Sequence, residues 1–569
     1  MDELERLSSE LKQFLTKYDK RIMLGHFTQL MENPSLRISQ DEVEPLSSPM
    51  RQLYYLAGLL VTTEECGKEV NYTKEDWKYI VEHLNAIETE YFIIFLPTEE
   101  TEITEEWKKK REVAMPSFLS YFNQGPLNFE EQAINWISDL YQKLDEIIES
   151  EIGLKTTDFL HFYDNLDRWC EDNLKSFLNP DISQICSNWQ EYTTLQLGMV
   201  DDAPEEIKAL GKSRLPMCTF VADYGMKNRF KASDLEDEDL PLDKVDKILS
   251  ILSFVVNDSD FLYYTSTSNP FYRYPIINLK DGLYQVFEIK QVLHAIDSYL
   301  EEICSSNSKN ETKYVKEKGN LLEHNIINLF SSILEKDIKC FNGYFVDECE
   351  QDILILWKDY AFIIEAKAYN IKEPFRNPDK AYKRIKQDFD RSIGYAYKQT
   401  WRVAEKFYKQ ESLLIKDKNG NIIDAIDTRR YLDKDFSIIV TQKSFGQIQS
   451  DLSYMLNLNE GSRYPWVIKY DDLEVFLLTL KAMHKKPQYL INFLIDREFL
   501  HGHVISSDEL QICGGYLDGK ITANICNAKS FVCCNPDFAL VFDKQYRKGM
   551  GFKNERYWKE KHDNTTLFI

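Results

Sequence analysis

Hydrophobic residues recur at helical spacing through the first 232 residues. In segments such as 130–144 and 157–169 they return every three or four positions, which places them on one face of a helix. Alternating β-branched runs are few, and breaks that carry Pro or Gly separate the segments. We therefore expect residues 1–232 to form a mostly α-helical N-terminal region, with a role in sensing, docking or oligomerisation.

Residues 233–313 are predicted to be a linker and helical connector. The run from Ser233 to Pro241 is acidic and ends in Pro, as many linkers do, although it equally suits the acidic first turn of a following helix. A helical pattern near Val286–Cys304 then leads into the polar segment Ser305–Thr312. We expect a domain boundary in that segment.

From residue 314 the pattern changes to strands interleaved with helices. Helices are expected at Gly319–Glu335 and, as one long basic helix, at Pro378–Tyr408. Apolar runs predict four strands, at Asp352–Trp357, Ala361–Ala368, Phe436–Thr441 and Trp466–Lys469. This alternation indicates an α/β domain over residues 314–480.

The last segment, residues 481–569, is expected to be a small extension of mixed α/β character. It carries a helical pattern at Gln488–Phe499 and candidate strands within Phe531–Phe542. The fold class predicted for the whole chain is therefore multidomain α+β, which agrees with a length of 569 residues.

Composition narrows the classes of function. The chain has 69 Lys+Arg and 93 Asp+Glu, a net charge of −24, so any nucleic-acid site must be a local basic patch. The start MDELERLSSE lacks a signal-peptide pattern, and no apolar run approaches the roughly 20 residues of a membrane span. The 11 Cys are scattered and odd in number. We expect a soluble cytoplasmic protein with no membrane partner.

The most informative segment is residues 351–367, which has two apolar strands around a turn at Lys358-Asp359. In an antiparallel hairpin with a two-residue loop, the numbers of paired residues have a constant sum, so Asp352 should face Glu365. Strand alternation then puts Lys367 on the face of Glu365. Lys-Asp is not a favoured tight-turn pair, which leaves a one-residue slip of the register open.

Two carboxylates that point together out of apolar strands repel each other and lose hydration, unless a cation lies between them. Oxygen ligands without His or Cys suit Mg²⁺ or Mn²⁺. A nearby ammonium can position water and offset charge on a phosphate. Asp352, Glu365 and Lys367 thus have the chemistry of a metal-dependent phosphodiester hydrolase.

A third carboxylate is expected from the preceding helix. Glu323 precedes Ile327, Phe330 and Leu334 at helical spacing, so it borders the apolar face that should pack on the sheet. From that position it can reach the metal site. The alternative for Glu323 is an ordinary exposed helix residue. The alternative for the hairpin residues is an exposed face held by salt bridges.

The pattern of a helix Glu followed by Asp-x(12)-Glu-x-Lys across a hairpin resembles the PD-(D/E)xK nuclease superfamily, over residues 314–480. The resemblance implies a restriction-endonuclease-like α/β/α core. It further implies that Asp352, Glu365 and the carbonyl of Ala366 are metal ligands, Lys367 is the catalytic lysine and Glu323 supports the metals. The Pro that names the motif is absent, since Glu350-Gln351 precede Asp352.

The resemblance also implies a Gln or basic residue on the next helix that faces the site. Gln387 takes that position, but the Gln-x-x-x-Tyr signature of the exonuclease branch is missing, because Arg391 lies four residues after it. Residues 358–418 carry 15 basic and nine acidic side chains. Lys383, Arg384 and Arg391 are candidates for phosphate contacts. The alternative is an amphipathic helix with solvated lysines, and we expect the interleaved aromatics, such as Tyr395, to be core residues.

Two other signals fail. Gly211-Lys-Ser213 lacks the first Gly of a phosphate-binding loop and follows a helical rather than a strand pattern. Four cysteines and two histidines near the C-terminus lack the paired spacing of a zinc site, so we expect no zinc there; they are Cys513, Cys526, Cys533, Cys534, His501 and His503.

Together these patterns predict a Mg²⁺- or Mn²⁺-dependent nuclease, with DNA as the expected nucleic-acid partner and endonucleolytic cleavage as the expected reaction. The resemblance makes a role in bacterial anti-phage or genome defence plausible. The alternatives are a non-catalytic nucleic-acid-binding or scaffold protein that retains the fold, and an RNA- or tRNA-cleaving nuclease. A homo-oligomer or a partner protein held through the N-terminal region is also open.

Overall fold

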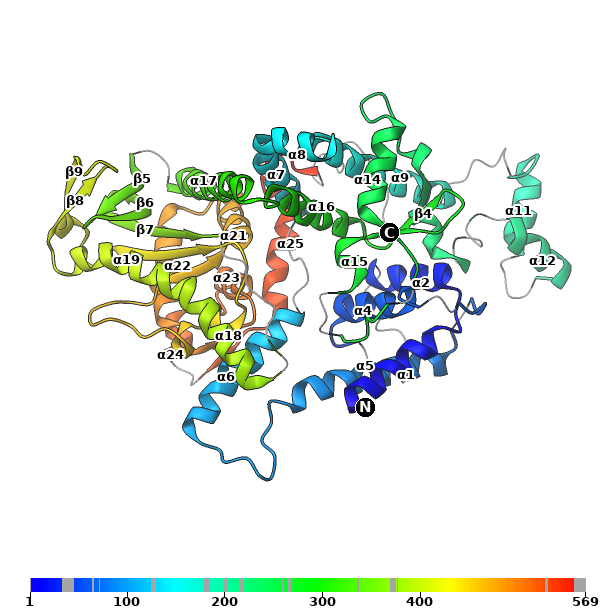
Figure 1. The fold of residues 1–569 in the computed structure, drawn as a ribbon, viewed down its shortest axis with the longest axis horizontal. Coiled ribbons are helices and arrows are strands. Elements are labelled where there is room, and N and C mark those ends of the chain that lie inside the picture. The colour runs from blue at the N-terminus through cyan, green and yellow to red at the C-terminus, as the bar shows by residue number, and fades with distance from the viewer. Residues whose placement is uncertain are drawn as a thin grey trace. The chain divides into compact units, whose positions relative to one another are not determined.

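The structure is a computed structural model, and it describes the chain except residues 1, 33–45, 64–65, 71, 124–128, 179–184, 199–202, 215, 217–219, 221, 258, 265–267, 335–336, 369–374, 376, 528–530 and 557–569. The chain forms two compact units (Figure 1). Unit 1 contains residues 1–91 and 136–310, and unit 2 contains residues 92–135 and 311–569. No helix among the described residues is long and apolar enough to cross a membrane.

Unit 1 is mostly helical in its described part, as the sequence pattern predicts for the N-terminal region. Its α-helices are α1 (Glu3–Leu15), α2 (Lys20–Glu32), α4 (Pro49–Val61), α8 (Asp145–Ile152), α9 (Thr156–Leu178), α11 (Trp189–Leu197), α12 (Glu205–Arg214), α14 (Leu242–Leu252), α15 (Pro270–Arg273) and α16 (Ile289–Cys304). Helices α5 (Lys74–Ile93) and α7 (Glu130–Tyr141) each cross the boundary between unit 1 and unit 2. Short 3₁₀ turns lie at Gln142–Leu144, Tyr224–Asn228 and Ala232–Asp234. The residues before Gly211 are helical as expected, and α12 continues through Gly211-Lys-Ser213.

A small four-stranded sheet belongs to unit 1 and lies in the segment predicted to be a connector. Its strand order is β1-β4-β3-β2, with strands β1 (Arg229–Lys231), β2 (Ser253–Val255), β3 (Ile276–Asn278) and β4 (Leu283–Val286). The acidic run is not a linker, because Leu235 and Leu240 are buried in it and Asp237 accepts a hydrogen bond from Asn165 at 2.9 Å. The linker interpretation is therefore wrong: these residues are packed into unit 1.

Unit 2 is built on a seven-stranded mixed sheet of order β11-β10-β7-β6-β5-β8-β9. Its strands are β5 (Ile338–Val346), β6 (Cys349–Trp357), β7 (Tyr360–Lys367), β8 (Ser412–Lys416), β9 (Ile422–Asp427), β10 (Asp435–Thr441) and β11 (Trp466–Lys469). Strands β7, β10 and β11 are parallel, whereas the pairs from β7 to β9 are antiparallel. The predicted strands are present, and β5, β8 and β9 were not predicted.

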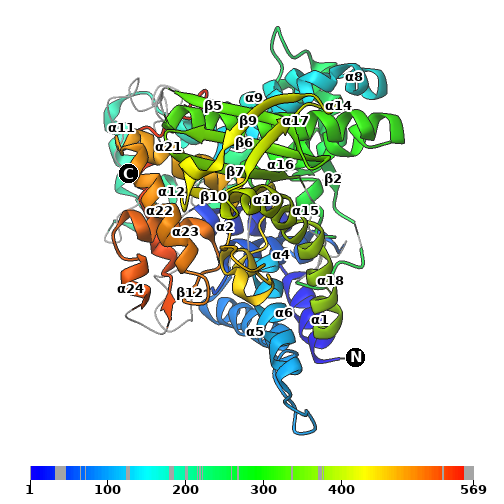
Figure 2. The same cartoon turned by 90° about the vertical axis from the view of Figure 1, so that its left-hand side faces the viewer.

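Helices cover both faces of this sheet (Figures 1 and 2). On one face, α19 (Ile393–Tyr408) packs its apolar residues, such as Val403 and Phe407, into a cluster with Leu354 and Ile363. On the other face, Phe330 of α17 (Ser308–Leu334) contacts Phe362, with 5.6 Å between ring centroids. Because β6 and β7 are covered on both sides, their sequences are almost continuously apolar. The chain is thus mixed α+β, and the seven-stranded sheet of unit 2 has helices on both faces.

The remaining elements of unit 2 are α6 (Glu105–Asn123), α18 (Pro378–Arg391), α20 (Gln447–Ser450), α21 (Tyr470–Ala482), α22 (Pro487–Phe499), α23 (Glu509–Leu517), α24 (Ala523–Asn527) and α25 (Leu540–Tyr546), the 3₁₀ turns Thr428–Tyr431, Leu452–Tyr454 and Pro536–Ala539, and the two-stranded sheet of β12 (Val504–Ile505) and β13 (Val532–Cys533). Residues 92–135 were not expected here. Gln132 Nε2 donates to Glu474 Oε2 at 2.7 Å, and Asn135 Nδ2 donates to the Lys553 carbonyl at 2.9 Å. A segment of the N-terminal half therefore belongs to the α/β unit.

Two predicted elements differ from the structure. The long basic helix at 378–408 is two helices, because the backbone leaves the helical region at Ser392 (φ −102°, ψ −87°); the next residue, Ile393, is fully buried. The strands expected within 531–542 shrink to the two residues of β13, and α25 follows. The C-terminal residues pack with the α/β domain in unit 2.

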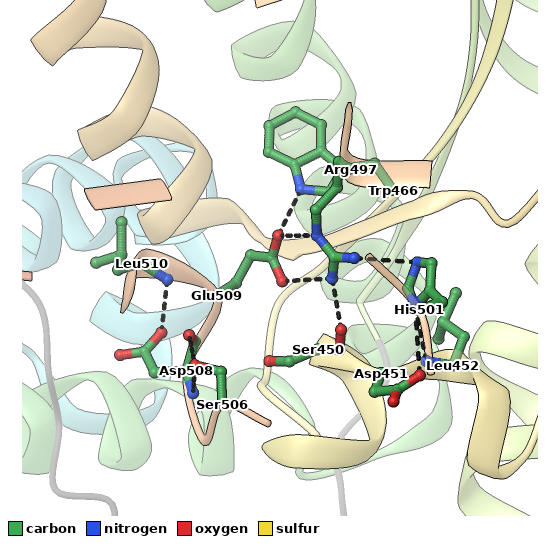
Figure 3. A network of polar contacts seen from close by, with 10 residues as sticks. All are labelled: Ser450, Asp451, Leu452, Trp466, Arg497, His501, Ser506, Asp508, Glu509 and Leu510. Carbon is green, nitrogen blue, oxygen red and sulfur yellow. Dashed lines mark hydrogen bonds and ion pairs between the residues drawn. The ribbon is translucent and has the colours of Figure 1, made fainter. Parts of the chain in front are cut away.

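A buried ion pair fixes the C-terminal helices to the sheet (Figure 3). The Arg497 guanidinium donates to both oxygens of Glu509, from Nε at 2.8 Å and from Nη2 at 2.9 Å, and Nη2 also donates to the Ser450 carbonyl at 2.6 Å. Trp466 of β11 donates to Glu509 Oε1 at 2.9 Å. Both charged side chains are almost fully buried, with exposed fractions of 1% and 2%. The network therefore joins β11, α22 and α23.

Replacing Glu509 by Leu should lower the free energy of unfolding of unit 2 by about 3–5 kcal/mol, because the Arg497 charge stays buried without its partner. Urea denaturation followed by circular dichroism measures this change. The double variant Arg497→Met/Glu509→Leu should regain most of the loss, since no charge then stays buried. As a control, Lys520→Ala in the exposed Asp518–Lys520 pair should cost less than about 1 kcal/mol. Equal losses in Glu509→Leu and the control would contradict the role of the network.

Candidate active site

The β6–β7 hairpin places Asp352 beside Glu365. Its register pairs Ile353 with Ile364 and Trp357 with Tyr360, which confirms the predicted turn at 358–359. The Asp352 main-chain N–H donates to Glu365 Oε1 at 3.2 Å, and the Ala366 N–H donates to Asp352 Oδ2 at 2.8 Å. Each carboxylate is thus held by the backbone of the neighbouring strand.

Lys367 completes the group from the same strand as Glu365. Its Nζ atom lies 2.9 Å from Glu365 Oε2 and 3.3 Å from Asp352 Oδ2. The Glu365 side chain is 1% exposed, whereas Asp352 and Lys367 are 18% and 16% exposed. The three residues therefore form a compact site whose inner carboxylate is buried and whose outer side reaches solvent.

Burial controls the electrostatics of the site. The pKa of Glu365 is raised to about 8, chiefly because burial removes hydration; the Lys367 ammonium opposes this rise and the Asp352 charge adds to it. Burial alone would lower the pKa of Lys367, but the charges of Glu365 and Asp352 raise it above its usual value. The ammonium consequently stays protonated at neutral pH, and the ionised form of Glu365 is costly.

Glu323 reaches the same site from α17. Burial raises its pKa to about 7, and the charge of Asp352 is the next largest cause. A hydrogen bond with Asn342 of β5 and the charge of Lys367 lower the pKa in part. The sensitivity of Glu323 to Asp352 and Lys367 shows that the helix carboxylate lies within electrostatic reach of the hairpin residues.

Two tyrosines lie near the site, and the sequence pattern did not place either of them there. The Tyr344 phenol of β5 is buried, and its pKa is raised well above normal by burial and then by the charges of Glu365 and Asp352. Its hydroxyl has no hydrogen-bond partner among the described residues. Tyr395 of α19 is 56% exposed, and its ring centroid lies 5.9 Å from Lys367 Nζ, so it is not the core residue we expected. Tyr344 was missed because β5 was not recognised.

The candidate phosphate-contacting residues lie outside this group. Lys383, Gln387 and Arg391 are exposed on α18, and Arg384 is half-buried with its guanidinium carbon 4.9 Å from the Phe375 ring centroid. The structure thus brings Asp352, Glu365, Lys367 and Glu323 together. It leaves the four α18 side chains on a separate helical surface.

The donor set fits a hard divalent cation in its chemistry. It offers carboxylate oxygens from Asp352, Glu365 and Glu323, and charge on two of these groups is disfavoured by burial, which a bound cation would relieve. Among the described residues, no three or more His, Cys, Asp or Glu side chains are arranged to hold a metal ion. Lys367 supplies the positive charge between Asp352 and Glu365 in this arrangement.

The C-terminal cysteines and histidines do not form a cluster in the described part of the chain. His501 Nδ1 accepts a hydrogen bond from the Leu452 N–H at 3.0 Å, so this ring belongs to the network of Figure 3. Cys513 is buried in α23, whereas Cys533 is exposed in β13. The side chain of Cys526 lies outside the described residues.

The chain matches no family model, no curated protein and no solved structure. Its activity must therefore be inferred from the side chains of this site.

Replacing Glu365 by Gln should change how stability depends on pH. Because the pKa of Glu365 is about 8 in the folded protein and near 4.5 when unfolded, folded wild type holds a proton that the unfolded chain releases. Wild-type stability should then fall as pH rises between these two values. The amide cannot ionise, so the variant should gain stability relative to wild type across the same window.

Thermal midpoints in EDTA, measured at several pH values across this window, test the prediction. Glu460→Gln, at an exposed carboxylate, should run parallel to wild type at every pH. A difference between Glu365→Gln and wild type that does not change with pH would contradict the buried, protonated Glu365.

Proposed function

We propose that this chain is a Mg²⁺- or Mn²⁺-dependent nuclease that hydrolyses phosphodiester bonds, with DNA as its substrate and an endonucleolytic mode of cleavage. The observation that carries the proposal is the meeting of Asp352, Glu365 and Lys367 at 2.9–3.3 Å on the β6–β7 hairpin. A carboxylate pair and a protonated lysine at the solvent-facing end of a buried sheet are the groups that phosphodiester hydrolysis needs. The three-layer unit around them is compatible with the PD-(D/E)xK resemblance.

In this proposal Asp352, Glu365 and the Ala366 carbonyl would hold the cation, and Glu323 would support it from α17. The bound cation would activate water and polarise the scissile phosphate. Lys367 has a raised pKa, so it would act as a hydrogen-bond donor that orients water and neutralises phosphate charge rather than as a base. The hydrogen bonds from the main-chain N–H groups of Asp352 and Ala366 would hold the two carboxylates in place during hydrolysis.

A nucleic-acid-binding or scaffold protein without turnover is the second candidate. It is favoured by the ion pairs of Lys367, which satisfy both carboxylates without a metal. In either case the helical unit 1 would serve for sensing, docking or oligomerisation, and a place in bacterial genome defence follows from the family resemblance alone. The substrate test described next distinguishes cleavage of RNA or tRNA from cleavage of DNA.

Incubating the purified chain with supercoiled plasmid, linear duplex, single-stranded DNA and RNA, each with Mg²⁺, Mn²⁺ or EDTA, tests the proposal. We expect metal-dependent cutting of DNA, reduced by about 10²–10⁴-fold in Lys367→Ala and in Asp352→Ala. Lys418→Ala, at an exposed loop lysine, should cut like wild type. Undiminished cutting in both site variants would refute the assignment, and cutting of RNA alone would replace DNA as the substrate.

A further inference from the structure

Helix α6 packs beside α18 within unit 2, although the two are more than 250 residues apart in the chain (Figures 1 and 2). Arg111 Nη1 donates to Asp379 Oδ1 at 3.0 Å, and the Arg111 guanidinium carbon lies 5.0 Å from the Trp107 ring centroid. Lys110 also interacts with the charge of Asp379. The first half of α6 is thereby fixed to the first turn of α18.

This contact brings together two basic segments. Helix α6 carries four consecutive cations, Lys108-Lys109-Lys110-Arg111, of which Lys108 and Lys109 are exposed. Among side chains that reach solvent, residues 105–112 and 378–391 have nine basic and five acidic groups, a net charge of +4 in a chain of −24. The cations are Lys108, Lys109, Lys110, Arg111, Lys380, Lys383, Arg384, Lys386 and Arg391, and we call this set the α6–α18 basic surface.

The α18 part of the surface precedes, in the chain, a residue that lies beside the site. Its exposed cations run from Lys380 to Arg391, 11 residues apart, which is about 17 Å along a helix. This length corresponds to roughly five phosphates on one strand of duplex DNA. Helix α19 begins two residues after Arg391, and its Tyr395 lies beside Lys367. In the sequence, the basic stripe therefore ends four residues before Tyr395, whose ring lies near Lys367.

We propose that the α6–α18 basic surface is a binding site for the phosphate backbone of duplex DNA, in which α6 extends the surface of α18 beyond the α/β core. The proposal rests on the proposed DNA substrate. In α6, which comes from the N-terminal half of the chain, Lys108 and Lys109 would contact the phosphates, because both are exposed and they are adjacent in the chain. Such side chains contact phosphates rather than bases, so binding is independent of sequence and falls steeply with salt.

The test uses the full chain with Lys108→Ala/Lys109→Ala, and fluorescence anisotropy of a labelled duplex in EDTA, so that no cleavage occurs. We expect weaker binding, and the slope of log Kobs against log salt should become shallower by about 2, one for each lost phosphate contact. Circular dichroism should be unchanged, because both side chains are exposed. Wild-type slope and affinity in this variant would overturn the proposal.

The matched control is Lys485→Ala/Lys486→Ala. These two adjacent lysines are exposed in unit 2 between α21 and α22, and the variant has the same change in charge. It should bind like wild type. Equal weakening in both variants would show that only the overall charge matters and would also overturn the proposal.

Lys367→Ala separates this surface from the proposed activity. It should lose cleavage and still bind duplex DNA, with a salt slope at most about 1 shallower than wild type for its single phosphate contact. Loss of cleavage in Lys367→Ala together with normal binding by Lys108→Ala/Lys109→Ala would leave the nuclease standing and refute the surface. Binding that depends on Lys108 and Lys109, in a wild type that cuts no substrate, would support the surface and refute the nuclease.

Discussion

The pairing of β6 with β7 is the constraint on which unit 2 and its candidate site depend. Both strands are buried on both faces, so a slip of one residue would turn every side chain to the opposite face of the sheet. In this register Lys358 of the turn has a positive φ of 53°, a region of backbone conformation that residues other than Gly and Asn rarely occupy. The same register puts Asp352 opposite Glu365. Core packing and site geometry are therefore set by one choice of pairing.

Two of the buried carboxylates in unit 2, Glu509 and Glu365, face basic partners in different surroundings. Glu509 faces Arg497 in a closed network, where Trp466 and the Ser450 carbonyl add hydrogen bonds and solvent is excluded. Glu365 faces Lys367, which is partly exposed and shares its ammonium with Asp352. A bidentate guanidinium is rigid, whereas an ammonium on a flexible chain can move away from its partner. The first pair suits a structural joint, and the second suits a site at which a cation or phosphate enters.

The candidate site could be predicted because it is local in sequence. Asp352, Glu365 and Lys367 lie on one hairpin, and two rules, strand alternation and the arithmetic of a two-residue turn, place them together. Glu323 followed from helical spacing. Tyr344 could not be found, because β5 alternates apolar and polar residues poorly, with a burial pattern that is exposed along much of its length. Gly394, two residues after Ser392, is the only local signal of the break in α18–α19, and the adjacent Ile393 is fully buried.

The place of residues 92–135 in unit 2 illustrates the other limit. Local patterns assign these residues to the helical half, and the contacts that determine their place, such as Arg111 with Asp379 and Gln132 with Glu474, span 268 and 342 residues. Acids lie 2.8–3.0 Å from four cations of the α6–α18 basic surface (Lys108, Lys110, Arg111 and Lys386), so this surface attracts a phosphate through its net excess of positive charge in a chain of −24. Moving a short basic helix segment beside α18 concentrates positive charge without changing the total. A tertiary contact can thus create a local field that neither segment has alone, and the linear sequence does not reveal it.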